Sequence, residues 1–384
     1  MKRIYMDYAA TTPVDPRVVK EMEPFFNEKF GNTMSIHSAG RAAKGAVDYA
    51  RERVASLMKA GPKRLIFTGS ATESNNMVLK GIASANKDKG KHIITSKIEH
   101  DCVLNSARWL EKQGFKVTYL PVDEYGLVDP KEVEKAITKE TILVSIMHAN
   151  NEIGTIEPIE EIGKVCRKKG VYFHTDAAQS FGKIPIDVNK MNLDLVTVNA
   201  HKMYGPQGVG ALYIREGVKI DPLLHGGGHE FGFRSSTSNV PGIVGFGKAA
   251  ELRKKEMDAE AKKLTKLRDR LIKGVLEIDD AHLNGHPTKR LPNNTNFWFA
   301  FIEGESLVLH LDMKGVDAST GSACSTSSLE PSHVLRAIGL KHEQAHGSLR
   351  LSLGKDTEEK DIDYVLKVLP GIVKNLRMIS PFKN

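Results

Sequence analysis

The sequence predicts an α/β protein, with a large domain built on a mainly parallel seven-stranded sheet covered by helices and a smaller α+β domain. The first observation is that short apolar runs alternate with amphipathic stretches from Arg64 to Arg215, as in parallel strands joined by helices. The second is a change beyond Gly245, where a long charged segment begins. In that segment apolar residues recur at helical spacing, at Leu264, Leu267, Leu271 and Val275.

Seven apolar runs are short enough to be buried strands. A run of about four to eight apolar residues between polar or turn residues favours a strand, because helices are usually longer. The seven runs are 65–68, 92–96, 117–122, 142–148, 171–174, 193–198 and 210–214.

Helices are predicted between several of these runs and in the C-terminal third. Segments 102–113 and 158–169 are amphipathic, and the second has proline in its first turn, where no backbone hydrogen bond is lost. The C-terminal third mixes helices, expected at 306–313 and 361–374, with strand-like runs at 296–301 and 349–353. We predict a large domain of residues 15–256 and a smaller domain of residues 1–14 and 257–384, connected by the long charged helix.

The composition indicates an ordinary globular protein. The chain has 384 residues and a hydrophobic content of 40%, enough to bury a large core. The net charge of +8 comes from basic residues mixed with acidic ones, as in 251–263, so neither nucleic acid nor a membrane is an expected partner. No apolar stretch has the length of a signal-peptide core or a membrane span, and we therefore expect a cytoplasmic protein.

The three cysteines, Cys102, Cys166 and Cys324, show no CxxC spacing. Neither a disulfide framework nor a zinc ribbon is expected, and the thiols should be reduced. Cys166 is in helical register with Ile162, which indicates a core position, and Cys102 is also expected to be structural. Cys324 lies among the small polar residues of 319–328, which have little to bury, so we expect an accessible and reactive thiol.

Lys202 and Asp176 follow two neighbouring apolar runs, 193–198 and 171–174. Ligands on parallel sheets collect at the carboxyl ends of the strands. A site for pyridoxal phosphate (PLP) needs an amine for the aldehyde and a carboxylate that keeps the pyridine nitrogen protonated, which makes the ring an electron sink. The pair therefore predicts a PLP site. The alternative for Asp176 is an ordinary helix cap.

Segment 68–76 follows a strand and opens a helix. Ser70 with Glu73 fits a capping box, and the amides of Ala71 and Thr72 would face an anion at the start of that helix. The segment therefore predicts a phosphate cradle, although a capped helix that binds nothing is the alternative. Asn199 and His201, which lie close to Lys202 in the sequence, could reach the same phosphate. For each of them a structural role is the alternative.

Further polar residues at strand ends are candidate contacts. Gln179 is placed to donate to the phenolate oxygen of the cofactor, and His100 to lie flat on its ring, although a lone histidine is commonly a satisfied polar group. Asn150 and Asn151 are placed to bond cofactor or substrate. Arg350 predicts a bidentate clamp for a substrate carboxylate, with a structural ion pair as the competing interpretation.

His342 to His346 match HExxH, the pattern of zinc proteases. Glycines at 339 and 347 confine this segment to about two turns, and its only apolar residue is Ala345. A zinc hydrolase is thus an alternative function of another class, although so short a motif arises readily by accident.

Eight segments together resemble the cysteine desulfurases of the NifS/IscS type, which are fold-type I PLP enzymes of the class V aminotransferase family. They are spread over nearly the whole length of the chain: 5–12 (YMDYAATT), 31–42 (GNTMSIHSAGRA), 70–76 (SATESNN), 150–154 (NNEIG), 176–179 (DAAQ), 200–206 (AHKMYGP), 321–335 (GSACSTSSLEPSHVL) and 346–354 (HGSLRLSLG). The chain departs from the family at Asn199, where serine or threonine is usual, and at 229–238, which reads HEFGFRSSTS where the family is closer to QERGxRSGTE.

The resemblance implies roles for residues that match the family by position. Lys202 would bond the cofactor aldehyde, His100 would stack on the ring, and Cys324 would accept sulfur as a persulfide. The ring contacts would be Asn151, Asp176 and Gln179, and the substrate contacts Arg350 and Asn151. The phosphate positions would be Ala71, Thr72, Asn199, Ala200, His201 and Thr237, the last reaching in from the partner subunit of a homodimer.

The implied reaction removes sulfur from L-cysteine, leaving L-alanine and a Cys324 persulfide that is passed to an iron–sulfur scaffold protein of the IscU type. Lys202 would remove the Cα proton of the substrate. Cys324 would in addition be a transient ligand of a nascent cluster on the scaffold. The rivals with the same fold are a selenocysteine lyase, an aminotransferase, and a catalytically silent partner that only binds a scaffold.

Overall fold

The computed structural model describes residues 3–320 and 331–380. Its largest sheet has seven strands in the order β2-β8-β7-β6-β5-β3-β4. The strands are β2 Leu65–Thr68, β3 His92–Ser96, β4 Lys116–Leu120, β5 Thr141–Ser145, β6 Tyr172–Asp176, β7 Leu195–Asn199 and β8 Gly210–Ile214. Strands β3 to β7 pair in parallel, whereas β8 is antiparallel to both β7 and β2. The predicted mainly parallel sheet of seven strands is confirmed, with every strand within three residues of its predicted bounds.

Strand β6 continues past the predicted end at His174 and includes Asp176. The prediction stopped early because Thr175 and Asp176 are polar. In the structure the polar side chains of the strand are bonded to its neighbours: His174 Nδ1 lies 2.9 Å from Ser145 Oγ, and His174 Nε2 lies 3.0 Å from Thr197 Oγ1. A buried strand tolerates such residues when each polar atom has a partner.

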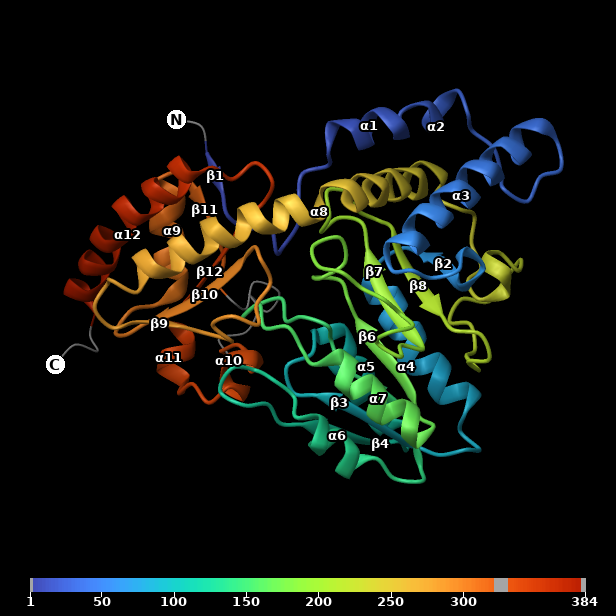
Figure 1. Ribbon diagram of the computed structural model, residues 1–384, viewed down its shortest axis with the longest axis horizontal. Coiled ribbons are helices and arrows are strands. Elements are labelled where there is room, and N and C mark those ends of the chain that lie inside the picture. The colour runs from blue at the N-terminus through green and yellow to red at the C-terminus, as the bar shows by residue number, and fades with distance from the viewer. Residues whose placement is uncertain (1–2, 321–330, 381–384) are drawn as a thin grey trace.

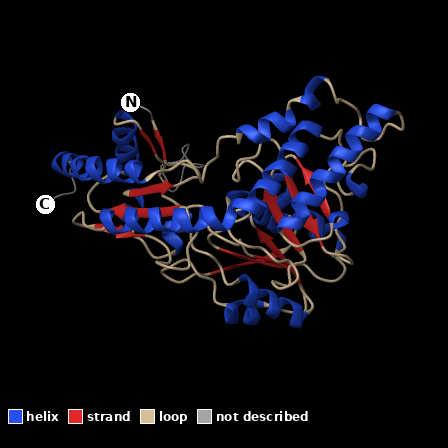
Figure 2. Ribbon diagram, turned by 45° about the horizontal axis from the view of Figure 1, so that its top comes forward, coloured by secondary structure: helices blue, strands red, loops and turns tan. Residues whose placement is uncertain are grey.

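Helices cover both faces of this sheet (Figures 1 and 2). The helices of this part of the chain are α1 Pro16–Met22, α2 Pro24–Asn27, α3 Ser38–Leu57, α4 Ala71–Ala85, α5 Asp101–Lys112, α6 Pro130–Ala136, α7 Ile159–Lys169 and α8 Val240–Val275, of which α1 and α2 lie over α8 and not on the sheet (Figure 1). Helix α7 contains the buried Cys166, as predicted, but Pro158 is its N-cap and not part of its first turn.

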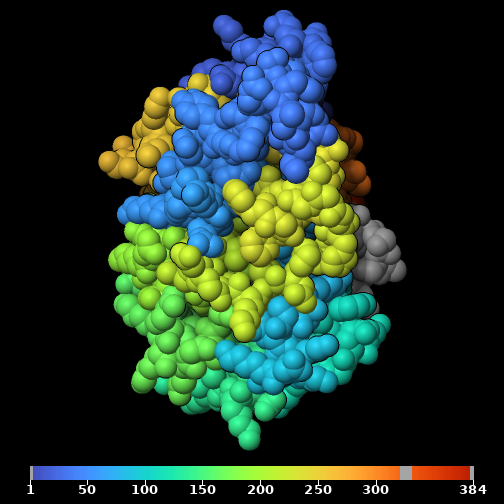
Figure 3. All heavy atoms as spheres, turned by 90° about the vertical axis from the view of Figure 1, so that its right-hand side faces the viewer, coloured from blue at the N-terminus to red at the C-terminus, as the bar shows by residue number. Residues whose placement is uncertain are grey.

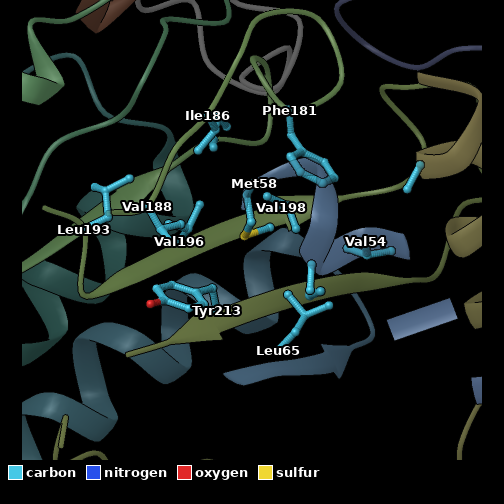
Figure 4. Packing of buried hydrophobic residues seen from close by; sticks show 14 of the residues in the cluster. Val54, Met58, Leu65, Phe181, Ile186, Val188, Leu193, Val196, Val198 and Tyr213 are labelled. Atoms are coloured by element: carbon cyan, nitrogen blue, oxygen red, sulfur yellow. The ribbon is translucent and has the colours of Figure 1, made fainter. Parts of the chain in front are cut away.

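Successive side chains of a strand point to opposite faces of the sheet, and each face has its own hydrophobic cluster. In β2, Leu65 and Phe67 join a cluster with α3, α7 and α8, whereas Ile66 joins a second cluster with α4 and α5. Figure 4 shows part of the first cluster, in which these residues pack: Val54, Met58, Leu65, Phe181, Ile186, Val188, Leu193, Val196, Val198 and Tyr213. Since both faces are apolar, the polar site residues can reach solvent only from the strand ends.

A second group of elements lies at the far end of α8 (Figure 1). It contains the three-stranded antiparallel sheet β12-β10-β9 and the parallel pair β1-β11. The elements are β1 Ile4–Tyr5, β9 Ala281–Leu283, β10 Asn294–Phe299, α9 Gly304–Met313, β11 Val316–Asp317, α10 His333–Ala337, α11 His342–His346, β12 Ser348–Ser352 and α12 Glu359–Ile379. Most of them enclose a separate hydrophobic cluster with the second half of α8. This arrangement supports the predicted two domains, whose boundaries stay a prediction.

The loop before α8 is anchored on β2 and α3 through Glu230, which lies in the short 3-10 helix Glu230–Gly232 (a second, Pro62–Arg64, precedes β2). The Glu230 carboxylate accepts hydrogen bonds from both terminal nitrogens of Arg51, at 2.6 and 2.9 Å, and from the Phe67 amide at 2.7 Å. Figure 3 shows this loop, in yellow, beside the blue α3. The segment that departs from the family pattern therefore has an ordered anchor of its own. Within the described residues, every helix is too short or too polar to cross a bilayer.

Candidate active site

Asp176 and Lys202 lie at the carboxyl ends of adjacent parallel strands. Asp176 ends β6 and pairs in register with Thr197 of β7, which ends at Asn199, shortly before Lys202. Both charges act on His100: the Asp176 carboxylate raises the pKa of that imidazole and the Lys202 ammonium lowers it. The structure thus brings together the three residues that the sequence assigned to one site.

The Asp176 carboxylate is almost fully buried and both its oxygens are bonded. Oδ2 accepts a hydrogen bond from Asn75 Nδ2 at 2.6 Å, and Oδ1 accepts one from the Ala178 amide at 2.8 Å. The second bond stabilises the turn after β6, and because no helix is described between β6 and β7, Asp176 is not the helix cap that was the alternative. The first comes from α4 and fixes the orientation of the carboxylate.

His100 is the N-cap of α5. Its Nδ1 accepts the backbone N–H of Cys102 at 3.2 Å, so the neutral ring carries its proton on Nε2. The pKa of His100 is lowered, first by burial and then by the Lys202 ammonium, against the opposing effect of Asp176. The imidazole is therefore neutral at neutral pH, with Nε2 able to donate a hydrogen bond.

The start of α4 has unused amide donors. Ser70 is the N-cap, and its Oγ accepts the Glu73 amide at 3.1 Å. The Glu73 carboxylate bonds the Gly69 amide instead of closing a capping box, and it pairs with Arg234 at 2.8 Å. The amides of Ala71 and Thr72, the first two residues of α4, have no acceptor among the described residues, 3–320 and 331–380. Two free amides at the positive end of a helix suit a phosphate group.

The segment from Asn199 to Lys202 forms a tight turn beside the N-terminal residues. Asn199 Oδ1 accepts the Lys202 amide at 3.3 Å, and the Ala200 amide donates to Val209 O at 3.3 Å. His201 Nδ1 lies 3.1 Å from Thr11 Oγ1. Burial and the Lys202 ammonium lower the pKa of His201 to about 4, so its ring is neutral. The side chains of Asn199 and His201 therefore shape the lysine turn, and their contact with a phosphate stays a prediction.

Gln179 is bonded at both ends of its amide. Its Nε2 donates to Ala9 O at 2.9 Å, and its Oε1 accepts from Lys183 Nζ at 3.4 Å. Burial lowers the pKa of Lys183 to about 7, and the Lys202 ammonium acts in the same direction. Lys183 was missed in the sequence because no motif distinguishes it from a surface lysine. Thr237, by contrast, is exposed in the loop before α8, and its role in a partner subunit's site stays a prediction.

Arg350 is buried and lies beside the turn after β5. Its Nη2 forms a 2.9 Å ion pair with Asp7, and its Nη1 donates to Asn151 O at 3.1 Å. Its Nε is buried without a hydrogen-bond partner. The competing interpretation of a structural ion pair is thus observed, while the unbonded Nε leaves a donor for a carboxylate. Asn150, in contrast, is fully buried. Its Nδ2 donates to Ile98 O, and its Oδ1 accepts the backbone amides of Glu152 and Ile153.

Two buried glutamates near the site were also missed. Burial raises the pKa of Glu152 to about 7, and Ser332 Oγ donates to Glu152 Oε2 at 2.5 Å. Burial raises the pKa of Glu99 to about 8, and the neighbouring His333 Nε2 bonds Glu99 O at 2.9 Å. Ser332 and His333 thus anchor the chain that follows the segment of Cys324. Cys324 itself lies outside the described residues.

The HExxH segment forms α11, a helix of only five residues. The rings of His342 and His346 lie 4.5 Å apart. Among the residues with described coordinates, no cluster of three or more His, Cys, Asp or Glu side chains is suited to a metal ion. Within the described residues, the motif therefore has no third protein ligand of the kind that a catalytic zinc site requires.

Comparison with known proteins identifies the family. Residues 4–365 match the aminotransferase class-V family. The chain is 58% identical to cysteine desulfurase IscS of Methanosarcina thermophila over 99% of this chain and 94% of the relative. It is 51% identical to the mitochondrial cysteine desulfurase of Saccharomyces cerevisiae, over 98% of this chain and 76% of the relative.

Solved structures agree with this assignment. A NifS-like protein superposes with a TM-score of 0.92 at 42% identity, covering 97% of this chain and 100% of that one. A protein named SspA, solved in complex with cysteine, has a TM-score of 0.82 at 39% identity, covering 91% of this chain and 98% of that one. The chain belongs to the aminotransferase class-V family and is an enzyme of its cysteine desulfurase branch, as its sequence predicted. The members of this family use PLP.

The residues present fit PLP. The amides of Ala71 and Thr72 suit its phosphate, the buried Asp176 suits its protonated pyridine nitrogen, and Lys202 would supply the amine for its aldehyde. These groups come from α4, β6 and the turn after β7, which meet at one edge of the sheet.

Proposed function

We propose that this chain is a PLP-dependent cysteine desulfurase that converts L-cysteine to L-alanine and holds the removed sulfur as a persulfide on Cys324. The single observation that carries the proposal is the convergence of Lys202, Asp176 and His100 at adjacent strand ends. The names of the relatives, and the cysteine complex of SspA, support cysteine as the substrate.

The cofactor, when bound, supplies an electron sink for charge that develops at the substrate Cα. Asp176, held by Asn75, would keep the pyridine nitrogen protonated. Lys202 would remove the Cα proton. His100, neutral with its proton on Nε2, would donate a hydrogen bond from Nε2 to the reacting centre. Arg350, whose Nε has no partner, would bind the substrate carboxylate.

In the sulfur step, the Cys324 thiolate attacks the sulfur of the substrate. An S–S bond forms and the Cβ–S bond of cysteine breaks, with its electron pair passing to carbon, which is protonated to give alanine. Atoms and electrons balance, since cysteine and one thiol yield alanine and one persulfide. No external oxidant is required.

Two variants separate the parts of this proposal. K202A should lose the visible absorption of bound cofactor together with alanine formation. C324S should keep the absorption and lose the persulfide, detected by mass spectrometry as one added sulfur on the protein after L-cysteine. C166S is the matched control, because Cys166 is a core residue. A persulfide that still forms in C324S would refute the choice of nucleophile.

We further propose a cytoplasmic homodimer in which Thr237 of one subunit completes the phosphate site of the other. The sulfur acceptor would be an iron–sulfur scaffold protein of the IscU type, on which Cys324 would transiently ligate a nascent cluster. Light scattering would test the dimer. Transfer of labelled sulfur from the Cys324 persulfide to a purified scaffold would test the acceptor.

A further inference from the structure

Cys102 lies between two residues of the candidate active site, although its sequence context indicated only a structural role. Its sulfur is 3.1 Å from Asn75 Nδ2 and 3.1 Å from His100 Nδ1. Asn75 also donates to Asp176 at 2.6 Å. A continuous chain of hydrogen bonds therefore leads from the Asp176 carboxylate through Asn75 and Cys102 to His100.

The donors in this chain can be assigned from their chemistry. The Asn75 amide group has two hydrogens, one directed to Asp176 and one to the sulfur, so the sulfur accepts from Asn75. Burial raises the pKa of Cys102 to about 12, and the Asp176 carboxylate adds to this, against the hydrogen bonds from Asn75 and Thr72. The thiol therefore keeps its own hydrogen at neutral pH. His100 Nδ1 accepts it, because the Cys102 amide already requires an unprotonated Nδ1.

We propose that Cys102 is a positioning residue for His100, whose thiol and amide together hold Nδ1 as an acceptor and keep the ring proton on Nε2. The inference rests on the proposed function, which gives His100 the role of donor. An imidazolium would carry a proton on Nδ1, directed against both Cys102 donors. The two Cys102 donors thus favour the neutral imidazole with its proton on Nε2. They also hold the ring more firmly than the hydrogen bond from the Cys102 amide would alone.

Among the residues that the structure describes, four other ionisable groups act on His100. Asp176 of β6 and Asp101 of α5 favour the protonated ring, whereas Lys202 after β7 and His333 of α10 oppose it. A conservative change at Cys102 leaves all four in place. A change in the titration of His100 after such a substitution therefore reports the loss of the thiol.

The test compares C102A with C102S, which retains a donor of similar size. His100 is observed by nitrogen NMR in the full-length protein labelled with [15N]histidine, and its signals are assigned by their loss in H100Q. Wild type and C102S should show a single tautomer with hydrogen on Nε2. C102A should show a mixture of tautomers and a titration midpoint about 0.5 to 1 pH unit higher, as expected for one hydrogen bond. C166A is the matched control and should leave the signals of His100 unchanged.

Identical His100 signals and midpoints in C102A and wild type would overturn the proposal, and so would equal shifts in C102A and C102S. In the holoenzyme, the acid limb of kcat/KM for L-cysteine should move upward in C102A by the same fraction of a pH unit. The NMR readout does not depend on turnover. If the wild-type protein forms no alanine from cysteine, the proposed function fails while the histidine signals still decide the role of Cys102.

Discussion

Asn75 Nδ2 donates to Asp176 Oδ2 across 2.6 Å, and this bond connects helix α4 to the end of β6. Both residues are buried, so the hydrogen bond is made to a charged group away from water. Bonds of this kind contribute more than neutral ones, because the unpaired charge would be costly. The position of the Asp176 carboxylate thus depends on Asn75, a residue of a different element.

Asn75→Ala should therefore weaken PLP binding. Loss of one hydrogen bond to a carboxylate corresponds to about 1.5–3 kcal/mol, or a roughly 10- to 100-fold higher Kd. The Kd is measured by titrating the protein with PLP and following the visible absorption. The control is Asn76→Ala, because the Asn76 side chain bonds only the exposed first turn of α4 through Thr72 O. Equal Kd values in the two variants would contradict the assigned role of Asn75.

Glu99→Gln should change how stability depends on pH. Burial raises the pKa of Glu99 to about 8, from 4.5 in the unfolded chain. Between these values the unfolded state releases a proton that the folded state keeps, so wild-type stability falls as pH rises. The unfolding free energy of the variant relative to wild type should therefore increase by about 2–3 kcal/mol from pH 5 to pH 7.

This difference is measured by urea unfolding at each pH. Glu124→Gln is the matched control, since it makes the same substitution at an exposed position. A pH-independent difference between wild type and Glu99→Gln would mean that Glu99 is ionised in the folded protein.

The sequence was sufficient to predict that Lys202 and Asp176 lie close together. Apolar runs reveal strand ends, and few residue types serve as aldehyde amine or pyridine counter-ion, so Lys202 and Asp176 could be paired without coordinates. Several predicted strand bounds differ from the observed ones by up to three residues. Strand β6 was predicted to end too early because Thr175 and Asp176 are polar, although Thr175 Oγ1 donates to Ile146 O, directly after β5.

The supporting residues could not be found in this way. Asn75 and Cys102 meet because α4 and α5 pack on the same face of the sheet, a contact between segments distant in the sequence. In the sequence, Glu99 next to His100 resembles the polar, exposed end of a strand. Only the fold shows that the Glu99 side chain is buried. Lys183 shows the same limit, because burial and not residue type sets its pKa.

Glu230→Ala should destabilise the protein by about 3–5 kcal/mol, because it leaves the buried Arg51 guanidinium without its carboxylate. The free energy of unfolding is measured by denaturant titration. Glu216→Ala removes a carboxylate of the same kind from a surface pair with Arg64 and should cost less than about 1 kcal/mol. Similar losses in both variants would show that the Glu230 pair is solvated.

Ser332→Ala should slow formation of the Cys324 persulfide while leaving PLP bound. Ser332 follows the segment of Cys324, and its hydroxyl donates to the buried Glu152. Removing the hydroxyl releases one anchor of the chain after Cys324 and leaves a buried carboxyl oxygen without its donor. Loss of about 1–2 kcal/mol of positioning corresponds to a roughly 5- to 30-fold slower step. Single-turnover mass spectrometry with L-cysteine measures the rate, and absorption measures the cofactor. Ser306→Ala, which removes a surface hydrogen bond to Glu303, is the control and should leave both unchanged. Wild-type persulfide rates in Ser332→Ala would show that the anchor does not guide Cys324.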